Sequence, residues 1–324
     1  MNLNSFKVAL RNLAKQKGYT AINIIGLAIG IASALLIALY VYEETTYDKF
    51  HPNHERLYRV YLKSRMMGTE MSGAVSCAPV GPTITKEYAD VESFCRTFNF
   101  GGDQLVRNGD KTFIAKRAIF ADSTFFKVFN GFKLLTGDPQ KALSKPNSLV
   151  LTQSASKKYF GNSDPVGLTV EVGNDRQKWV ITGVMEDVPN SSHFHFDFLL
   201  SMVSIPNLAD GTFWISNNNY TYLLLKPDTD PKVIDQHLTE LVEKYAYPQA
   251  EQFFGTLSSN LEESGSTYGY YTQNVTDIHL KSELQYEFEA GGSEVMVYVF
   301  VIIAVFILII AAINFMNLAT ARST

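Results

Sequence analysis

Residues 18–42, GYTAINIIGLAIGIASALLIALYVY, are twenty-five consecutive residues without a charged side chain. A helix rises about 1.5 Å per residue, so this run can cross the ~30 Å hydrocarbon core of a bilayer. A second uncharged run, residues 295–321, lies close to the end of the 324-residue sequence. The sequence therefore predicts two transmembrane helices with residues 43–294 between them.

Charge is distributed unevenly around the two runs. Five of the 28 basic residues lie on their outer flanks, whereas all 32 acidic residues lie between them. The flanking bases are Lys7, Arg11, Lys15, Lys17 and Arg322. By the positive-inside rule, both flanks are cytoplasmic and the acidic middle lies outside the inner membrane. An acidic middle also argues against a nucleic-acid-binding face.

Residues 1–17 are expected to form a cytoplasmic amphipathic basic helix. Lys7, Arg11 and Lys15 recur every four residues, opposite apolar residues at helical spacing, and Lys17 follows them. We expect these bases to face anionic lipid headgroups; a solvated basic lead-in is the alternative. A cleaved signal peptide is disfavoured, because the apolar run is longer than the roughly 7–15 residues typical of one and no small-residue cleavage site follows it.

Both apolar runs carry residues suited to helix packing in lipid. Small residues recur every four positions in the first run, and amides lie three apart near the end of the second: Gly26, Gly30, Ala34 and Ala38, then Asn314 and Asn317. Small residues let helix backbones approach closely, and amides are costly against lipid. These residues are expected to pack against other helices, in a bundle larger than two spans.

The region between the runs reads as a mixture of strands and helices. Expected strands are 57–62, 113–120, 148–152, 168–172, 178–188, 220–225 and 268–280; expected helices are 81–88, 125–129, 153–160 and 230–247. An early strand–helix–strand arm and a late one would fold together next to the membrane. Residues of roughly 121–205 would then form an inserted, strand-rich lobe. The predicted fold class is α+β.

No enzymatic motif is present in the sequence. The phosphate-binding pattern GxxxxGK[ST], the nucleophile elbow GxSxG and the zinc motif HExxH are all missing from the 324 residues, and no cofactor is expected. His193 and His195, like His51 and His54, lack the further ligands that a zinc site needs, so polar turns are the favoured interpretation.

Two further groups of residues have structural interpretations. Five carboxylates are expected to be solvated or capping groups and not a catalytic pair: Glu43, Glu44, Asp48, Glu186 and Asp187. Cys77 and Cys95 are the only cysteines, and both lie in the exported part. They could form a disulfide there or remain two separate buried thiols.

Several strings resemble one family. They are LNSFKVALRNLAKQKGYTAINIIGLAIGIASALLI, YDKFHPNHERLYRV, ADSTFFKVFNGFKLLTGDPQKAL, LVLTQSASKKYFGNSDPVG, WVITGVMEDVPNSSHFHFDFLLS, TDIHL and ILIIAAINFMNLATARS. In this order they resemble ABC-transporter permeases with a MacB-like periplasmic core domain and FtsX-like membrane helices. The resemblance implies that residues 43–294 are the periplasmic core domain.

The resemblance also implies function and partners. A separate cytoplasmic ATPase subunit would drive movements that the spans transmit to the periplasmic domain, so the chain is a non-catalytic permease subunit in the inner membrane. A second permease copy or half and a periplasmic adaptor are further implied partners. Family permeases have four membrane helices, so residues 322–324 are expected to begin a cytoplasmic loop in a truncated chain.

A two-span receptor is the alternative from a different functional class. Its ligand-sensing domain would also lie between two transmembrane helices, as in a sensor histidine kinase. Topology alone does not separate the two interpretations, whereas the helix-packing residues and the family strings favour the permease.

Overall fold

The computed structural model describes residues 17–66, 69–99, 104–109, 111–115, 117–209, 211–254 and 267–320. These residues divide into two compact units. The first unit holds the described parts of Met1–Thr46 and Gly292–Thr324, and the second is Tyr47–Gly291. Lys7, Arg11 and Lys15, together with the predicted helix that contains them, lie outside the described residues.

The first unit consists of helices α2 (Lys17–Thr45) and α11 (Glu294–Thr320). Within them, Ala21–Thr45 and Glu294–Met316 are long and apolar enough to cross a membrane, with mean hydropathies of 2.6 and 3.3. Each stretch extends ~35 Å at the rise of an α-helix, which exceeds the thickness of a bilayer core. The domain boundaries expected from the sequence remain predictions.

Within this unit, α2 and α11 pack together along the small residues of α2. A Cβ atom placed on Gly30 would lie 2.7 Å from the Cβ of Ala311, and one placed on Gly26 would lie 3.2 Å from Nδ2 of Asn314. Ala34 is buried, whereas Ala38 is exposed. Lys17 and Asn317 lie within the two helices, but their side chains are not described. A role for any of these residues in a larger bundle stays a prediction.

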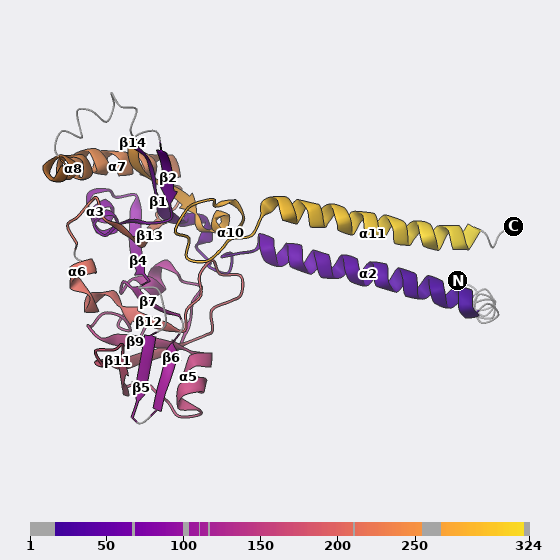
Figure 1. The fold of residues 1–324 in the computed structure, drawn as a ribbon, viewed down its shortest axis with the longest axis horizontal. Coiled ribbons are helices and arrows are strands. Elements are labelled where there is room, and N and C mark those ends of the chain that lie inside the picture. Colours follow the sequence, from indigo (N-terminus) through magenta and orange to yellow (C-terminus); the bar gives the residue numbers. More distant parts are fainter. Residues whose placement is uncertain are drawn as a thin grey trace. The chain divides into compact units, whose positions relative to one another are not determined.

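The second unit is built on one mixed sheet (Figure 1). Its main path, from edge to edge, runs β14 (Thr267–Asn274), β1 (Leu57–Met66), β13 (Asn217–Leu225), β4 (Val91–Phe98), β7 (Ala118–Ala121), β12 (Phe198–Ser201), β9 (Ser148–Thr152), β11 (Gln177–Met185), β10 (Thr169–Val172), β5 (Gln104–Asn108) and β6 (Lys111–Ala115). Three short strands pair off this path: β2 (Thr69–Gly73), β3 (Ser76–Cys77) and β8 (Leu134–Thr136).

Two strand–helix–strand arms form one end of the sheet, as the sequence predicts. The early arm is β1, α3 (Val80–Glu87) and β4, and the late arm is β13, α7 (Pro231–Leu241) and β14. Asp230 caps α7 by accepting a hydrogen bond from the amide of Lys232, and Pro231 occupies the first turn. A π-helical segment, Val242–Ala246, then leads into α8 (Tyr247–Phe254).

Alternation along β13 explains how this part of the sheet is covered on both faces. Leu223 and Leu225 pack in the cluster that also contains Ile234 and Leu238 of α7. Tyr222 and Leu224 point to the opposite cluster. That cluster is rich in phenylalanine and includes Phe125, Phe129, Phe132, Phe194 and Phe196. Of these, Phe125 belongs to α4 (Phe125–Val128). The aromatic residues of 125–129 therefore pack in the core.

The other end of the sheet carries α5 (Gln153–Phe160) (Figure 1). Thr152 caps this helix through its side-chain oxygen, which accepts from the amide of Ala155. The preceding strand β9 is buried at every position. Its Leu149 and Leu151 pack with α5 residues, whereas Val150 points to the aromatic cluster. The α+β class predicted from the sequence is confirmed.

Two predicted strands differ from the structure. Residues 113–120 are split between β6 and β7, which lie at different places in the sheet. The strand predicted at 268–280 ends at Asn274, because the side-chain oxygen of Asn274 accepts from the amide of Thr276 and starts a helical turn. The chain continues as Val275–Asp277 and α10 (Ile278–Lys281). The short helix α6 (Pro206–Ala209) was not predicted.

The close approach at Gly30 gives a test of packing between the spans. Replacing Gly30 by Leu should separate α2 from α11, since its first side-chain atom would overlap Ala311. The rings of Tyr40 and Phe300 are 5.1 Å apart, so cysteines at these two positions should cross-link efficiently in the native background and poorly with Gly30→Leu. Gly18→Leu is the control, because nothing lies within 4 Å of a Cβ there. Equal cross-linking in both variants would contradict this packing.

Candidate functional site

Two linkers enter and leave the second unit, and they are named here by their residues. The entry linker is 47–56, which follows α2 in sequence and ends at β1. The exit linker is 282–291, which follows α10 and precedes α11 in sequence. Both contact residues 189–197, called here the shared segment, which runs directly into β12.

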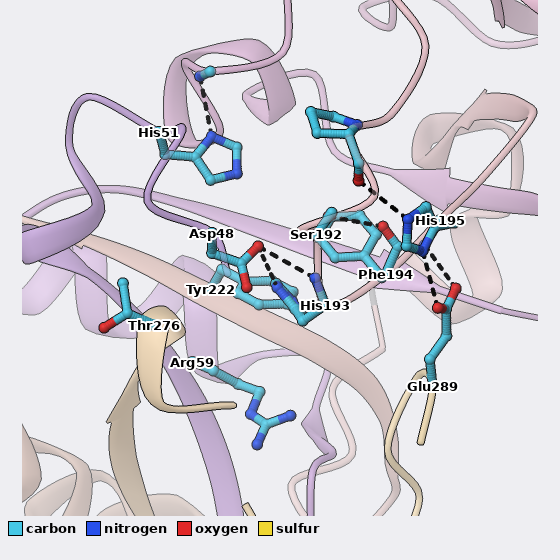
Figure 2. Close-up of polar contacts among 12 residues, drawn as sticks. Asp48, His51, Arg59, Ser192, His193, Phe194, His195, Tyr222, Thr276 and Glu289 are labelled. Atoms are coloured by element: carbon cyan, nitrogen blue, oxygen red, sulfur yellow. Dashed lines mark hydrogen bonds and ion pairs between the residues drawn. The ribbon is translucent and has the colours of Figure 1, made fainter. Parts of the chain in front are cut away.

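The entry linker holds the shared segment through a buried carboxylate. Asp48 is fully buried, and its amide donates to the carbonyl of Ser191 at 2.7 Å. Its Oδ1 lies 2.9 Å from Nδ1 of His193 and accepts from the His193 amide at 3.3 Å (Figure 2). In the described part of the chain, Oδ2 of Asp48 has no hydrogen-bond partner. A buried charge of this kind depends on its partner.

The far side of the His193 ring faces β13. Nε2 of His193 lies 2.8 Å from the hydroxyl of Tyr222. Burial raises the pKa of Tyr222 well above its usual value, so the phenol keeps its proton. On the other side of the ring, Nδ1 lies 2.9 Å from Asp48 but, among the described residues, makes no hydrogen bond. Asp48, His193 and Tyr222 thus form a continuous buried contact from the entry linker to the middle of the sheet.

His51 fixes the next turn of the entry linker. It is fully buried against the rings of Phe50, Phe129 and Phe132, and its Nδ1 accepts from the amide of Gly131 at 3.0 Å. Burial lowers the pKa of His51 from its ordinary value of 6.5 to about 3. The ring is therefore neutral and serves as a structural acceptor.

The exit linker contacts the shared segment through an exposed pair. The carboxylate of Glu289 accepts from the amide of His195 at 2.8 Å and lies 2.9 Å from its Nδ1 (Figure 2). Nε2 of His195 lies 3.1 Å from the carbonyl oxygen of Pro189. The side chain of Glu289 is 41% exposed, in contrast to that of Asp48.

A second contact ties the exit linker to β1. The Arg59 side chain is buried and pairs with Glu287, and it also donates to Gln273 at 2.6 Å and to Ser282 at 3.0 Å. Phe288 packs against Phe194 and Tyr220 at the edge of the aromatic cluster. The exit linker is thus held up to residue 288 by contacts with the sheet.

The linkers and the shared segment enclose a small cavity of about 40 Å³. Its lining residues are Tyr47, Ser192, His193, Ile278, His279, Ser282, Glu287, Glu289, Ala290 and Gly291. A cavity of this size has room for a few water molecules and not for a drug-sized ligand. The arrangement connects both linkers to the sheet, and no pocket for a drug-sized ligand is formed at this place.

The structure gives the sequence candidates different roles. His193 and His195 do not act as a pair, since one contacts Asp48 and Tyr222 and the other contacts Glu289. Among the described residues, no group of three or more His, Cys, Asp or Glu side chains could hold a metal ion. Cys77 and Cys95 are free, buried thiols.

The carboxylate prediction is partly wrong. Asp187 is a capping group as expected, accepting from the amide and hydroxyl of Ser154 at the start of α5. Asp48, however, is buried and paired and not solvated, because the shared segment covers it. Arg59, Tyr222, Glu287 and Glu289 were not identified from sequence. Of these four residues, only Arg59 lies in one of the family-like strings quoted above.

The difference in burial predicts unequal effects of neutralising the two carboxylates. Asp48→Asn should lower the free energy of unfolding by about 3–5 kcal/mol, because it removes one partner of a buried pair. Glu289→Gln, the matched control, should cost less than about 1 kcal/mol, since its pair is solvent-screened. Denaturant unfolding of the full chain in detergent measures both values. Equal losses would show that burial does not distinguish the two contacts.

The lowered pKa of His51 predicts an acid-sensitive fold. The unfolded chain takes up a proton near pH 6.5 and the folded chain only near pH 3, so stability falls as pH decreases through this range. The loss from this group should reach about 2 kcal/mol at pH 5. In His51→Phe, the difference in stability between pH 8 and pH 5 should shrink by that amount, as measured by unfolding at both pH values. An unchanged difference would rule out a neutral, buried His51.

Comparison with known proteins identifies the family. The family model for the MacB-like periplasmic core domain matches residues 20–241, which is more than half of the chain. No curated protein matches the sequence. A solved domain of a protein described as a permease, from Porphyromonas gingivalis, is 24% identical, with a TM-score of 0.56, covering 69% of this chain and 91% of that one.

Two other solved structures match with lower scores. The periplasmic region of MacB from Actinobacillus actinomycetemcomitans is 18% identical, with a TM-score of 0.44, covering 71% of this chain and 95% of that one. The extracellular domain of the noncanonic ABC-type transporter YknZ from Gram-positive bacteria is 12% identical, with a TM-score of 0.40, covering 67% of this chain and 100% of that one. On the strength of the family match, the chain belongs to the family of proteins with a MacB-like periplasmic core domain.

Proposed function

We propose that this chain is the transmembrane permease subunit of an ABC-type exporter or mechanotransmission complex. A separate cytoplasmic ATPase supplies the energy, and the spans pass its movement to the periplasmic domain. Family membership supports the permease assignment. The sequence itself has no phosphate-binding GxxxxGK[ST] motif, so ATP hydrolysis falls to a partner subunit.

The observation that carries the proposal is that both linkers bond to one segment of the sheet. Asp48 follows α2 by three residues, and Glu289 precedes α11 by five. They bond to His193 and His195, which lie two residues apart. The shared segment continues into β12, which pairs with β7 on one side and β9 on the other. A displacement of either linker is therefore delivered to the middle of the sheet while these contacts hold.

The ends of the two helices support an inner-membrane location with a periplasmic domain. Tyr40 and Tyr42 are exposed near the end of α2, and Tyr298 is exposed near the start of α11. Tyrosines at such positions favour the membrane–water interface. Together with the basic flanks, they support a cytoplasmic N-terminus, with lipid around both spans.

Further partners follow from the proposed role. Asn314 is exposed on α11 in the described chain, and an amide in lipid gains from a neighbouring helix. A second permease copy or half would supply such a helix. A periplasmic adaptor is a third proposed partner. No catalytic or cofactor-binding residue is assigned to the chain itself.

Purification of the tagged full chain from its native membranes tests the proposal. We expect a P-loop ATPase to co-purify and to hydrolyse Mg-ATP in a vanadate-sensitive manner. An unrelated two-span protein with the same tag is the control. Recovery with a signalling kinase, or a membrane-inserted chain that recruits no ATPase, would contradict the permease assignment and favour the two-span receptor.

A further inference from the structure

The entry linker is held by buried contacts along its length. Asp48, His51 and Asn53 are all buried, and the Asn53 side chain donates to the carbonyl of Val128 at 2.9 Å. Successive turns are closed by backbone bonds, from the amide of His51 to Asp48, of His54 to His51 and of Arg56 to Asn53. A segment bonded in this way moves as one piece with the domain that contains it.

The exit linker loses such contacts after Phe288. Within the part of the chain that the structure describes, no amide from 286 to 293 donates a hydrogen bond to a backbone carbonyl. Glu289 contacts His195, and Ala290, Gly291 and Gly292 follow it before Ser293, whose Oγ accepts from the amide of Met296 at the start of α11. Small residues with two glycines leave the backbone many accessible conformations.

One contact of this stretch is a close approach of its backbone to α10. A Cβ atom on Gly291 would lie 2.6 Å from the carbonyl oxygen of His279, so the chain passes α10 at a distance that only glycine allows.

We propose that the two linkers have unequal roles, the entry linker acting as a fixed anchor and the exit linker as a hinge that opens at the Glu289–His195 contact. The inference rests on the proposed function and deepens it. Opening the solvent-accessible Glu289–His195 pair costs little free energy, because water replaces the lost partner. Opening the Asp48–His193 contact would leave a buried charge without a partner.

The consequence concerns how movement enters the sheet. The shared segment follows the entry linker closely, because both Ser191 and His193 are bonded to Asp48. Movement arriving through α11 meets the hinge first, and reaches the sheet only while Glu289 holds His195. The first span would drive the domain, and the second would be coupled to it conditionally.

Spin labels test this inequality on the full chain in lipid. Ala290→Cys reports on the exit linker and Lys49→Cys on the entry linker, and both positions are exposed. The native thiols of Cys77 and Cys95 are fully buried and should not take up the label. The label at 290 should rotate at least about threefold faster than the label at 49, since only the entry linker is fixed. Equal mobility at both positions would overturn the proposal.

Substitutions of Glu289 and His195 test whether the exit linker opens at their contact or is mobile regardless of it. Glu289→Gln should speed the label at 290 by about twofold or more and leave the label at 49 unchanged, because it removes only the exit contact. His195→Gln should do the same, and the double variant should add nothing further. Additive effects, or a response at 49, would contradict opening at this contact.

The co-purified ATPase complex provides the last measurement. Trapping with ATP and vanadate should change the spectrum of the label at 290 and not that at 49. A change at 49 alone, or at both positions equally, would overturn the proposal. If no ATPase is recruited, the proposed function fails, and the mobility comparison on the reconstituted chain still decides between hinge and anchor.

Discussion

The buried Asp48–His193 contact is the interaction on which the rest of the second unit depends. It joins the first residues after α2 to the segment that enters β12, and Tyr222 extends it to β13. All three side chains are buried; the His193 amide donates to Asp48, and Nε2 of His193 is hydrogen-bonded to the Tyr222 hydroxyl. The buried neutral ring of His51 supports the same linker from the next turn. The entry of the chain into the domain is thereby fixed.

The sheet brings these distant residues together. Strand β1 carries Arg59 and β13 carries Tyr222, in adjacent antiparallel strands with Arg59 directly opposite Tyr222. The shared segment lies against them because β12 joins the same sheet through β7. The rings of Phe129 and Phe194 pack against each other and against Tyr222 and His193 on one side of these contacts. The fold thus places the contacts of Asp48 and Glu289 with the shared segment, together called the joint, beside the aromatic cluster.

The helices and the fold class could be predicted from the sequence, whereas the contacts that form the joint could not. Apolar runs and charge asymmetry identify the two helices of the first unit, and local sequence patterns identify the helices α7 and α5. The joint depends on pairs separated by 145 residues for Asp48 and His193 and by 94 for His195 and Glu289. A single sequence contains no signal for such pairs, so Asp48 read as a solvated acid. For the same reason β7 could not be separated from β6.

Hydrogen exchange of the shared segment, in the complex with the proposed ATPase, tests the central claim most directly. Its amides are bonded to Asp48, Glu289 and Arg117, so their exchange reports on the joint. Trapping with ATP and vanadate should alter exchange across 189–197 in the native chain. In folded Asp48→Asn, hydrolysis should continue while this response disappears. The same response in native and variant chains would show that movement does not pass through the joint.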